Sequence, residues 1–177
     1  MRKTIIAFLA ALFVAAVAPG PSPAGDLVYA VSHGYTPLKQ PPRYWEVGVT
    51  SKPPPKGVHP EYAVGEPDGR LAGWARKKGD LILGFDCKTG IRNVDGPDLF
   101  IWHFGPGGTR VYVSTEPKAP AEWHLLGVLP GTEEHIVEKR GMEIGELDRV
   151  FFVRIEKWDA GFWGKGRFID AVAGMSE

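Results

Sequence analysis

Four carboxylates stand out in the sequence because each lies beside turn residues or on an otherwise apolar strand. Glu66 and Asp68 lie in a Gly-Glu-Pro-Asp-Gly segment, Asp98 ends a Gly-Pro-Asp segment, and Asp170 is the centre of Phe-Ile-Asp-Ala-Val. Alternate residues of a strand share a face, so Asp98 and Asp170 each share a face with large apolar side chains. A carboxylate on a buried face needs backbone donors, an arginine or a cation to compensate its charge.

Two interpretations of these carboxylates follow. In the first, Asp68 and Asp98 accept hydrogen bonds from amides of their own turns, and Asp170 pairs with an arginine such as Arg92 or Arg154. In the second, Asp68, Asp98 and Asp170 bind a hard cation, since calcium takes roughly six to eight oxygen ligands from carboxylates and loop carbonyls. The first is favoured, because the sequence has no EF-hand or repeat spacing. A structural calcium ion is a hypothesis, and the sequence requires no cofactor.

Motifs for catalysis are weak. A pair of carboxylates hydrolyses glycosides only at a set separation, which a sequence does not show. The five histidines are scattered without zinc-site spacing. No Gly-x-Ser-x-Gly nucleophile elbow is present, and the glycine-rich residues 105–108 are typical of a hairpin turn. We therefore expect a non-catalytic protein, with a carbohydrate-active enzyme as an alternative.

Residues 157–167 join two predicted strands and carry three aromatic side chains among glycines and charges, namely Trp158, Phe162 and Trp163. Aromatic rings are unfavourable in water, so they either plug the end of a sandwich or form a platform for a flat ligand face such as a sugar ring. Plugging is the default. These three residues are nevertheless the candidate ligand contacts, because loops on a rigid β scaffold commonly carry recognition.

The N-terminus has the pattern of a secretory signal, with two basic residues followed by an uncharged apolar run at 5–18. Ser22 and Ala24 place small residues where the signal peptidase reads, so residues 1–24 are expected to be removed. The run is shorter than the roughly 20 apolar residues of a membrane span, and no second apolar stretch follows later in the sequence. We expect a periplasmic or extracellular protein without a membrane anchor after cleavage.

About 150 residues then remain, enough for one domain with a real core. Without Arg2 and Lys3, 19 basic residues face 21 acidic ones. No overall field therefore attracts nucleic acid, which is not expected as a partner. Cys87 is the sole cysteine, so no intrachain disulfide can form, and we expect it to be buried as a small apolar side chain.

Residues 25–60 form a proline-rich N-terminal segment, with seven prolines from position 37 to position 60. Proline fixes φ and removes a donor, so the segment should be mostly extended, with edge strands at 27–31 and 44–49. Residues 61–177 form the β-sandwich domain. Its short β runs, separated by turn residues, are expected at 80–86, 99–104, 110–115, 123–129, 134–138, 150–156 and 167–173.

Alternation is clearest at 150–156, where Phe151, Val153 and Ile155 share one face while Arg154 and Glu156 point the other way. Outside the signal, no long window shows a helical apolar stripe, so only a short helical turn near 142–147 is expected. The sequence therefore predicts an all-β protein, an antiparallel β-sandwich or jelly roll with at most short helical turns.

Five motifs in order cover most of the mature chain: Ala-Val-Gly-Glu-Pro-Asp-Gly at 63–69, Gly-Asp-Leu-Ile-Leu-Gly-Phe at 79–85, Gly-Pro-Asp-Leu-Phe-Ile-Trp at 96–102, Val-Tyr-Val-Ser at 111–114 leading to Trp123, and Phe-Ile-Asp-Ala-Val at 168–172. This order resembles a family of bacterial secreted and cell-surface domains with a jelly-roll, galactose-binding-like fold. The resemblance implies a sandwich used for carbohydrate or surface adhesion, often with a structural calcium ion. Phe168 and His103 stand where the family commonly has acids, which weakens the implied metal site.

The leading hypothesis is an exported binding module for glycan or another component of the cell envelope. A structural or assembly protein that binds another protein is the second hypothesis. Fold similarity alone does not assign a ligand.

Overall fold

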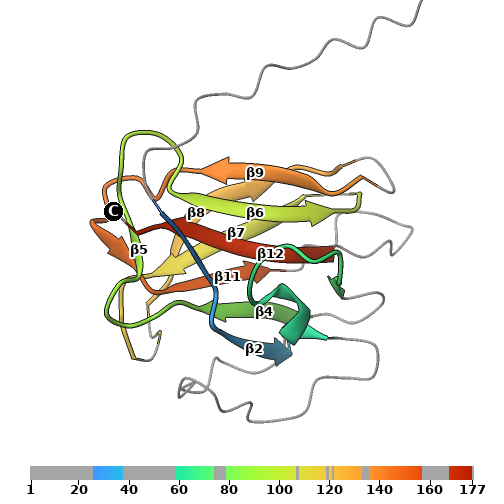
Figure 1. Ribbon diagram of the computed structural model, residues 1–177, viewed down its shortest axis with the longest axis horizontal. Coiled ribbons are helices and arrows are strands. Elements are labelled where there is room, and N and C mark those ends of the chain that lie inside the picture. Colours follow the sequence, from blue (N-terminus) through green and yellow to red (C-terminus); the bar gives the residue numbers. More distant parts are fainter. Residues whose placement is uncertain are drawn as a thin grey trace, which may run out of the picture.

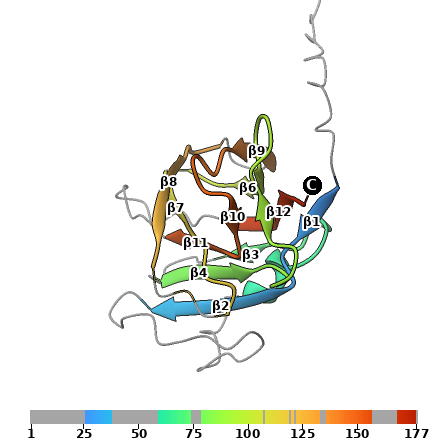
Figure 2. The same ribbon diagram turned by 90° about the vertical axis from the view of Figure 1, so that its left-hand side faces the viewer.

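Two antiparallel sheets packed face to face form a β-sandwich (Figures 1 and 2). This computed structural model describes residues 26–37, 59–73, 79–106, 108–118, 120, 122–132, 136–156 and 168–176, without the side chains of 35–37. Within these residues the helical content is one 3-10 turn, η1 (Pro60–Ala63). No helix in the described part is long and apolar enough to cross a membrane. The predicted all-β antiparallel sandwich is confirmed.

Sheet I has the strand order β1-β12-β6-β9, with β3 paired to β12, and sheet II has the order β2-β4-β11-β7-β8. The strands of sheet I are β1 (Leu27–Tyr29), β3 (Ala72–Gly73), β6 (Leu99–Phe104), β9 (Glu138–Met142) and β12 (Phe168–Met175). Those of sheet II are β2 (Ser32–Pro37), β4 (Gly79–Gly84), β7 (Thr109–Ser114), β8 (His124–Leu129) and β11 (Phe152–Glu156). A small ribbon pairs β5 (Ile91–Arg92) with β10 (Arg149–Val150).

The strand pairings define a jelly roll. Strand β1 pairs with β12, β4 with β11, β6 with β9 and β7 with β8, so early strands pair with late ones around a central hairpin. The chain is therefore one long antiparallel ribbon folded on itself. The pairings β12–β6 and β11–β7 wind this ribbon into two sheets, which is jelly-roll topology.

The N-terminal strands close one edge of the sandwich by bonding to both sheets. The amide of Ala30 donates to the carbonyl of Val172 in sheet I at 3.0 Å, and the amide of Val31 donates to the carbonyl of Gly84 in sheet II at 2.9 Å. Figure 2 shows β1 and β2 crossing from one layer to the other. The start of the segment 25–60 therefore contributes strands to both sheets, and residues 38–58 lie outside the described residues.

Alternation along the strands fills the space between the sheets with aliphatic side chains. Val153 and Ile155 of β11 point inward, as the sequence predicts, and join a continuous core that draws on both sheets, including Leu81, Leu83, Leu99, Ile101, Val111, Val113, Leu129, Ile169 and Val172. Phe151 was expected on that face but packs instead with Ile82 and Phe152, because a break in pairing separates β10 from β11 there.

Three sequence expectations are wrong in detail. Residues 142–147 form the end of β9 and a turn with a left-handed glycine at Gly145, instead of a helical turn. The strand expected at 134–138 begins at Glu138 and runs to Met142. Cys87 is exposed, because it lies in the turn that follows β4. The edge strand expected at 44–49 lies outside the described residues.

The small ribbon packs on β12 so closely that a glycine is required there. A Cβ added at Gly174 would lie 2.6 Å from Cγ2 and 2.7 Å from Cδ1 of Ile91, and it would also meet Cγ1. Ile91 is fully buried and has no room to move.

We expect Gly174→Ala to lower the free energy of unfolding by about 1–3 kcal/mol through overpacking. Gly127→Ala is the matched control, because its added Cβ would make only one contact, with Cε of Met142 at 3.4 Å. Urea denaturation of both variants measures the difference. Equal stability of the two variants would contradict the packing of β5 on β12.

Candidate functional site

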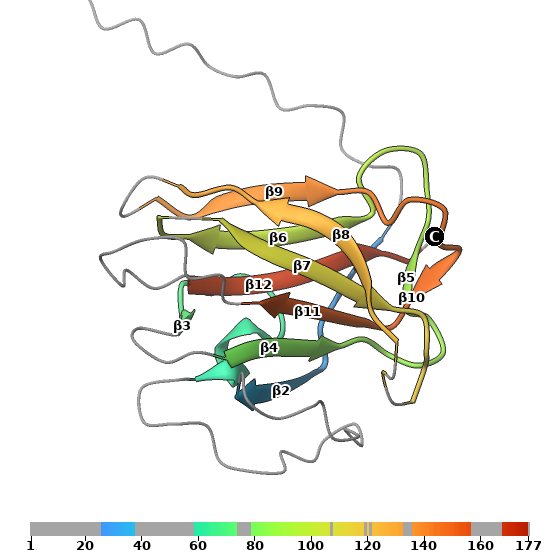
Figure 3. The same cartoon turned by 180° about the vertical axis from the view of Figure 1, so that it is seen from behind.

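The outer face of sheet II presents charged and aromatic side chains on neighbouring strands. Since the core residues of β4, β7 and β11 point inward, the residues that alternate with them point outward. Glu156 lies opposite both Asp80 and Arg110, and Arg154 lies opposite both Ile82 and Tyr112. Figure 3 shows this side of the sandwich, with β8, β7, β11 and β4 in order.

We call Asp80, Tyr112, Trp123, Arg154 and Glu156 the Arg154 cluster. The guanidinium carbon of Arg154 lies 4.1 Å from the centroid of the Tyr112 ring and 5.0 Å from that of Trp123. The Arg154 side chain is only 18% exposed. A cation that is largely removed from water against two aromatic rings gains from both ring quadrupoles. The rings therefore hold the guanidinium in place on the sheet.

The two carboxylates of the cluster differ in how well they are compensated. Glu156 accepts a hydrogen bond from the hydroxyl of Tyr112 at 3.0 Å, and Arg110 lies 3.6 Å from the same oxygen. Asp80 has an ion pair with Arg154, whose Nε lies 3.6 Å from Oδ2, which is longer than a hydrogen bond. Glu156 is therefore tied to two neighbours, whereas Asp80 is held loosely.

Burial raises the pKa of Asp80 to about 6 from an ordinary value of 3.8. The positive charge of Arg154 opposes this shift and the negative charge of Glu156 adds to it. The Asp80 side chain is 14% exposed. A carboxylate that is buried without full compensation lowers stability and is more common at functional sites than elsewhere.

Three buried polar atoms of the cluster have no hydrogen-bond partner among the described residues: Oδ1 of Asp80, Nε of Arg154 and Nε1 of Trp123. An unsatisfied buried polar atom costs about 1–3 kcal/mol. One acceptor and two donors at a place bounded by aromatic rings match the chemistry of a ligand that carries hydroxyl groups, because a hydroxyl both donates and accepts. The Arg154 cluster is the candidate functional site.

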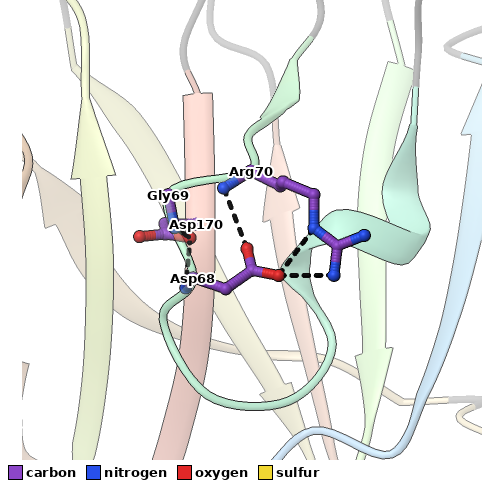
Figure 4. A network of polar contacts seen from close by, with 4 residues as sticks. All are labelled: Asp68, Gly69, Arg70 and Asp170. Carbon is purple, nitrogen blue, oxygen red and sulfur yellow. Dashed lines mark hydrogen bonds and ion pairs between the residues drawn. The ribbon is translucent and has the colours of Figure 1, made fainter.

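Asp170 and Asp68 lie next to each other, as Figure 4 shows, but the contact is between the Asp170 carboxylate and the backbone of the Asp68 loop, not between the two carboxylates. The buried carboxylate of Asp170 accepts hydrogen bonds from the amides of Asp68 and Gly69 at 3.2 and 3.1 Å. The side chain of Asp68 points away and binds the amide and guanidinium of Arg70. The expected pairing of Asp170 with Arg154 is wrong, since Arg154 lies with Asp80 on the other sheet.

Asp98 is fully buried and lies apart from this pair. Its carboxylate accepts from the amide of Val94 at 2.6 Å and from that of Ile144 at 2.8 Å, and its carbonyl accepts from the amide of Met175. Met175 lies five positions after Asp170 in β12, or about 16 Å along a strand. Asp98 and Asp170 are thus buried in separate places and do not form the carboxylate pair that a glycosidase needs.

The carboxylates therefore act on the fold: Asp170 anchors the loop that precedes β3, and Asp98 fixes the loop that follows β9. Within the described residues no group of three His, Cys, Asp or Glu side chains is arranged to hold a metal ion. Calcium binding by Asp68, Asp98 and Asp170 stays a prediction, and melting curves with added Ca²⁺ and with chelator test it. Glu66 is exposed.

The loop aromatics Trp158, Phe162 and Trp163 lie outside the described residues, so their role as ligand contacts stays a prediction. The outer face of sheet I also carries aromatic rings, with Nζ of Lys139 lying 4.3 Å from the Phe100 centroid and 5.0 Å from that of Trp102. No carboxylate of the described residues pairs with Lys139 there. This second face thus lacks the mixed charges of the Arg154 cluster.

Sequence reasoning missed Asp80, Tyr112 and Trp123 as site residues. One signal was present, because alternation at 150–156 already turned Arg154 and Glu156 away from the core. The residues beside them depend on which strands flank β11, and this follows from long-range pairing.

Comparison with known proteins adds structural likenesses at low identity. No family model and no curated protein matches the chain. A family 29 carbohydrate-binding module from Piromyces equi is 7% identical, with a TM-score of 0.49 over 87% of this chain and 92% of that one. Another family 29 module is 13% identical, with a TM-score of 0.39 over 82% of this chain and 90% of that one. A family 29 variant solved with mannohexaose is 18% identical, with a TM-score of 0.39 over 65% and 86%. Likeness at these values does not assign a function.

The raised pKa of Asp80 predicts how stability depends on pH. Because the folded state holds this proton more tightly than the unfolded chain does, stability falls as pH rises from about 4 to about 6. Asp80→Asn removes the ionisation, so the variant should be more stable than the wild type above pH 6 by up to about 3 kcal/mol, at ~1.4 kcal/mol per pKa unit over 3.8 to about 6.

Urea denaturation across this pH range measures the difference, which should shrink to near zero below about pH 4. Asp86→Asn is the control, because amides of the turn after β4 lower the pKa of Asp86 and the residue is exposed. A variant Asp80→Asn that is less stable than the wild type at neutral pH would contradict this account.

Proposed function

We propose that this protein is an exported, non-catalytic β-sandwich module that binds a glycan of the cell envelope through the Arg154 cluster. The observation that carries the proposal is a guanidinium packed against two rings on an outer sheet face, with three polar atoms of the cluster that lack a hydrogen-bond partner among the described residues. Export is supported by the signal pattern of residues 1–24.

Glycan is the ligand class that fits this chemistry best. A sugar ring has a flat apolar face that packs on an aromatic ring, and a rim of hydroxyls that need donors and acceptors at fixed positions. Tyr112 and Trp123 supply rings, while Asp80 and Arg154 supply an acceptor and a planar donor group. The cluster contains two carboxylates and one guanidinium, and Arg110 beside it balances the charge. The described charges of this face thus balance, which suits a neutral oligosaccharide.

Calorimetric titration with a panel of neutral hexasaccharides, of glucan, mannan and chitin type, tests the proposal. We expect Arg154→Gln to weaken binding by roughly tenfold or more, since it removes charged donors to the ligand. Lys139→Gln is the matched control, because it also removes one cation that packs on two aromatic rings, but on the opposite face.

Tyr112→Phe is a milder variant that removes only the hydroxyl bound to Glu156, so it guards against a loss of folding in Arg154→Gln. It should weaken binding by a few-fold, in keeping with the loss of one hydrogen bond of about 1 kcal/mol. No binding of any panel member by the wild type would contradict the proposal, as would equal weakening by Arg154→Gln and Lys139→Gln.

A protein partner is the second candidate function, favoured by exposed aliphatic side chains on one side of the molecule. Leu125 and Val128 of edge strand β8 are 56% and 50% exposed, and Ile136 and Val137 before β9 are 52% and 41% exposed. Apolar residues on an edge strand attract other chains. Ile136→Lys would abolish such an association, as seen by sedimentation, and would leave glycan binding by the Arg154 cluster unchanged, because Ile136 precedes β9 of the other sheet.

A further inference from the structure

The two carboxylates of the Arg154 cluster differ in how many neighbours compensate their charge. Glu156 is held by the hydroxyl of Tyr112 and by Arg110, so its charge is compensated whether or not a ligand is present. Asp80 has Arg154 at 3.6 Å and an oxygen, Oδ1, without a hydrogen-bond partner in the described part of the chain. Of the two, Asp80 is the carboxylate that can change its charge without breaking a hydrogen bond of the described residues.

Among the described residues, few charged and titratable groups share this face with Asp80. Strand β11 contributes Arg154 and Glu156, and β7 contributes Arg110 and Tyr112. On its other side, β2 places Thr36 opposite Asp80, and the side chain of Thr36 is not described. Counted over these described side chains, two cations face two anions when Asp80 is ionised. One positive charge is left over when Asp80 is protonated.

That charge belongs to Arg154. Arg110 keeps Glu156 as its neighbour, and among the described residues Asp80 is the only carboxylate within 4 Å of Arg154. Its guanidinium stays fixed against Tyr112 and Trp123 in either state, since the rings carry no charge. A planar guanidinium in a fixed position is the side chain best suited to hold a ligand carboxylate with two parallel hydrogen bonds.

We propose that Asp80 is a charge gate for the ligands of this face: ionised, it admits neutral glycans and repels glycans that carry carboxylates, and protonated, it lets Arg154 bind a uronate carboxylate. This inference rests on the proposed function and adds the ligand class that is accepted in each state. It is consistent with the raised pKa of Asp80, which places the change at about pH 6. A sugar carboxylate, with an ordinary pKa near 3.5, stays ionised through that change.

Calorimetric titration of the wild type with a neutral hexasaccharide and with hexagalacturonate, each at about pH 7.5 and about pH 5, tests the gate. We expect the neutral ligand to bind at the higher pH and the hexagalacturonate to bind at least roughly tenfold more tightly at the lower pH, because a like charge a few ångström away disappears. Asp80→Asn should bind hexagalacturonate at about pH 7.5 as tightly as the wild type does at about pH 5.

Asp86→Asn is the matched control, because it makes the same change of charge at the opposite end of β4, and the pKa of Asp86 is lowered by amides of its turn. It should keep the pH dependence of the wild type. Melting curves establish that each variant is folded under both conditions.

The outcomes separate the gate from the proposed function. If the wild type binds the neutral ligand but its affinity for hexagalacturonate does not rise on acidification, the gate is wrong and glycan binding stands. If Asp80→Asn still excludes hexagalacturonate at about pH 7.5, or if Asp86→Asn admits it equally well, the gate is also wrong. If the wild type binds neither ligand at either pH, the proposed function fails, and the gate fails with it.

Discussion

The packing of the Arg154 guanidinium against two aromatic rings is the contact on which the functional account depends. A largely buried cation needs compensation, and here it comes mainly from ring faces, with one carboxylate at ion-pair distance. This arrangement leaves three buried polar atoms of the cluster without a hydrogen-bond partner among the described residues. The jelly-roll winding makes it possible, since it sets β11 between β4 and β7 and so brings three distant parts of the sequence to one face.

The buried carboxylates of this protein divide into two kinds, and the difference separates fold from function. Asp98 and Asp170 each accept two hydrogen bonds from backbone amides of loops, so their charge stabilises the native loop conformations. Asp80 has no such donors in the described part of the chain, and its burial raises the energy of the folded state when it is ionised. An ionised Asp80 lowers the stability of the fold, whereas an amide or an apolar side chain at the same position would not. A residue with such a cost is expected at a binding site.

Much of the fold could be predicted from the sequence because β alternation is local. The strand expected at 99–104 is β6 to the residue, and the inward positions of Val153 and Ile155 followed from their spacing. The succession of short strands predicted a sandwich or jelly roll, and the strand pairings show a jelly roll. Local signals failed where a turn looked helical, at 142–147, and where a lone cysteine was assumed to be buried.

The candidate site could be predicted only in part, because it is made by partners far apart in the chain. Alternation turned Arg154 outward, but nothing near it in sequence indicates that Asp80 lies on the adjacent strand, 74 positions earlier. Of the two amides that donate to Asp98, that of Val94 could be predicted because it is four residues away in the same turn. That of Ile144 could not, because it is 46 residues away. The loop contacts Trp158, Phe162 and Trp163 stay predictions.

The claim that the outer face of sheet II binds glycan is tested most directly by recording proton–nitrogen correlation NMR spectra during a titration with a neutral oligosaccharide. The account predicts that the Nε–H signal of Arg154 and the indole N–H signal of Trp123 shift together and saturate at one affinity, while the indole signal of Trp102 on sheet I does not move. Saturable shifts at Trp102 with Arg154 and Trp123 unchanged would contradict it.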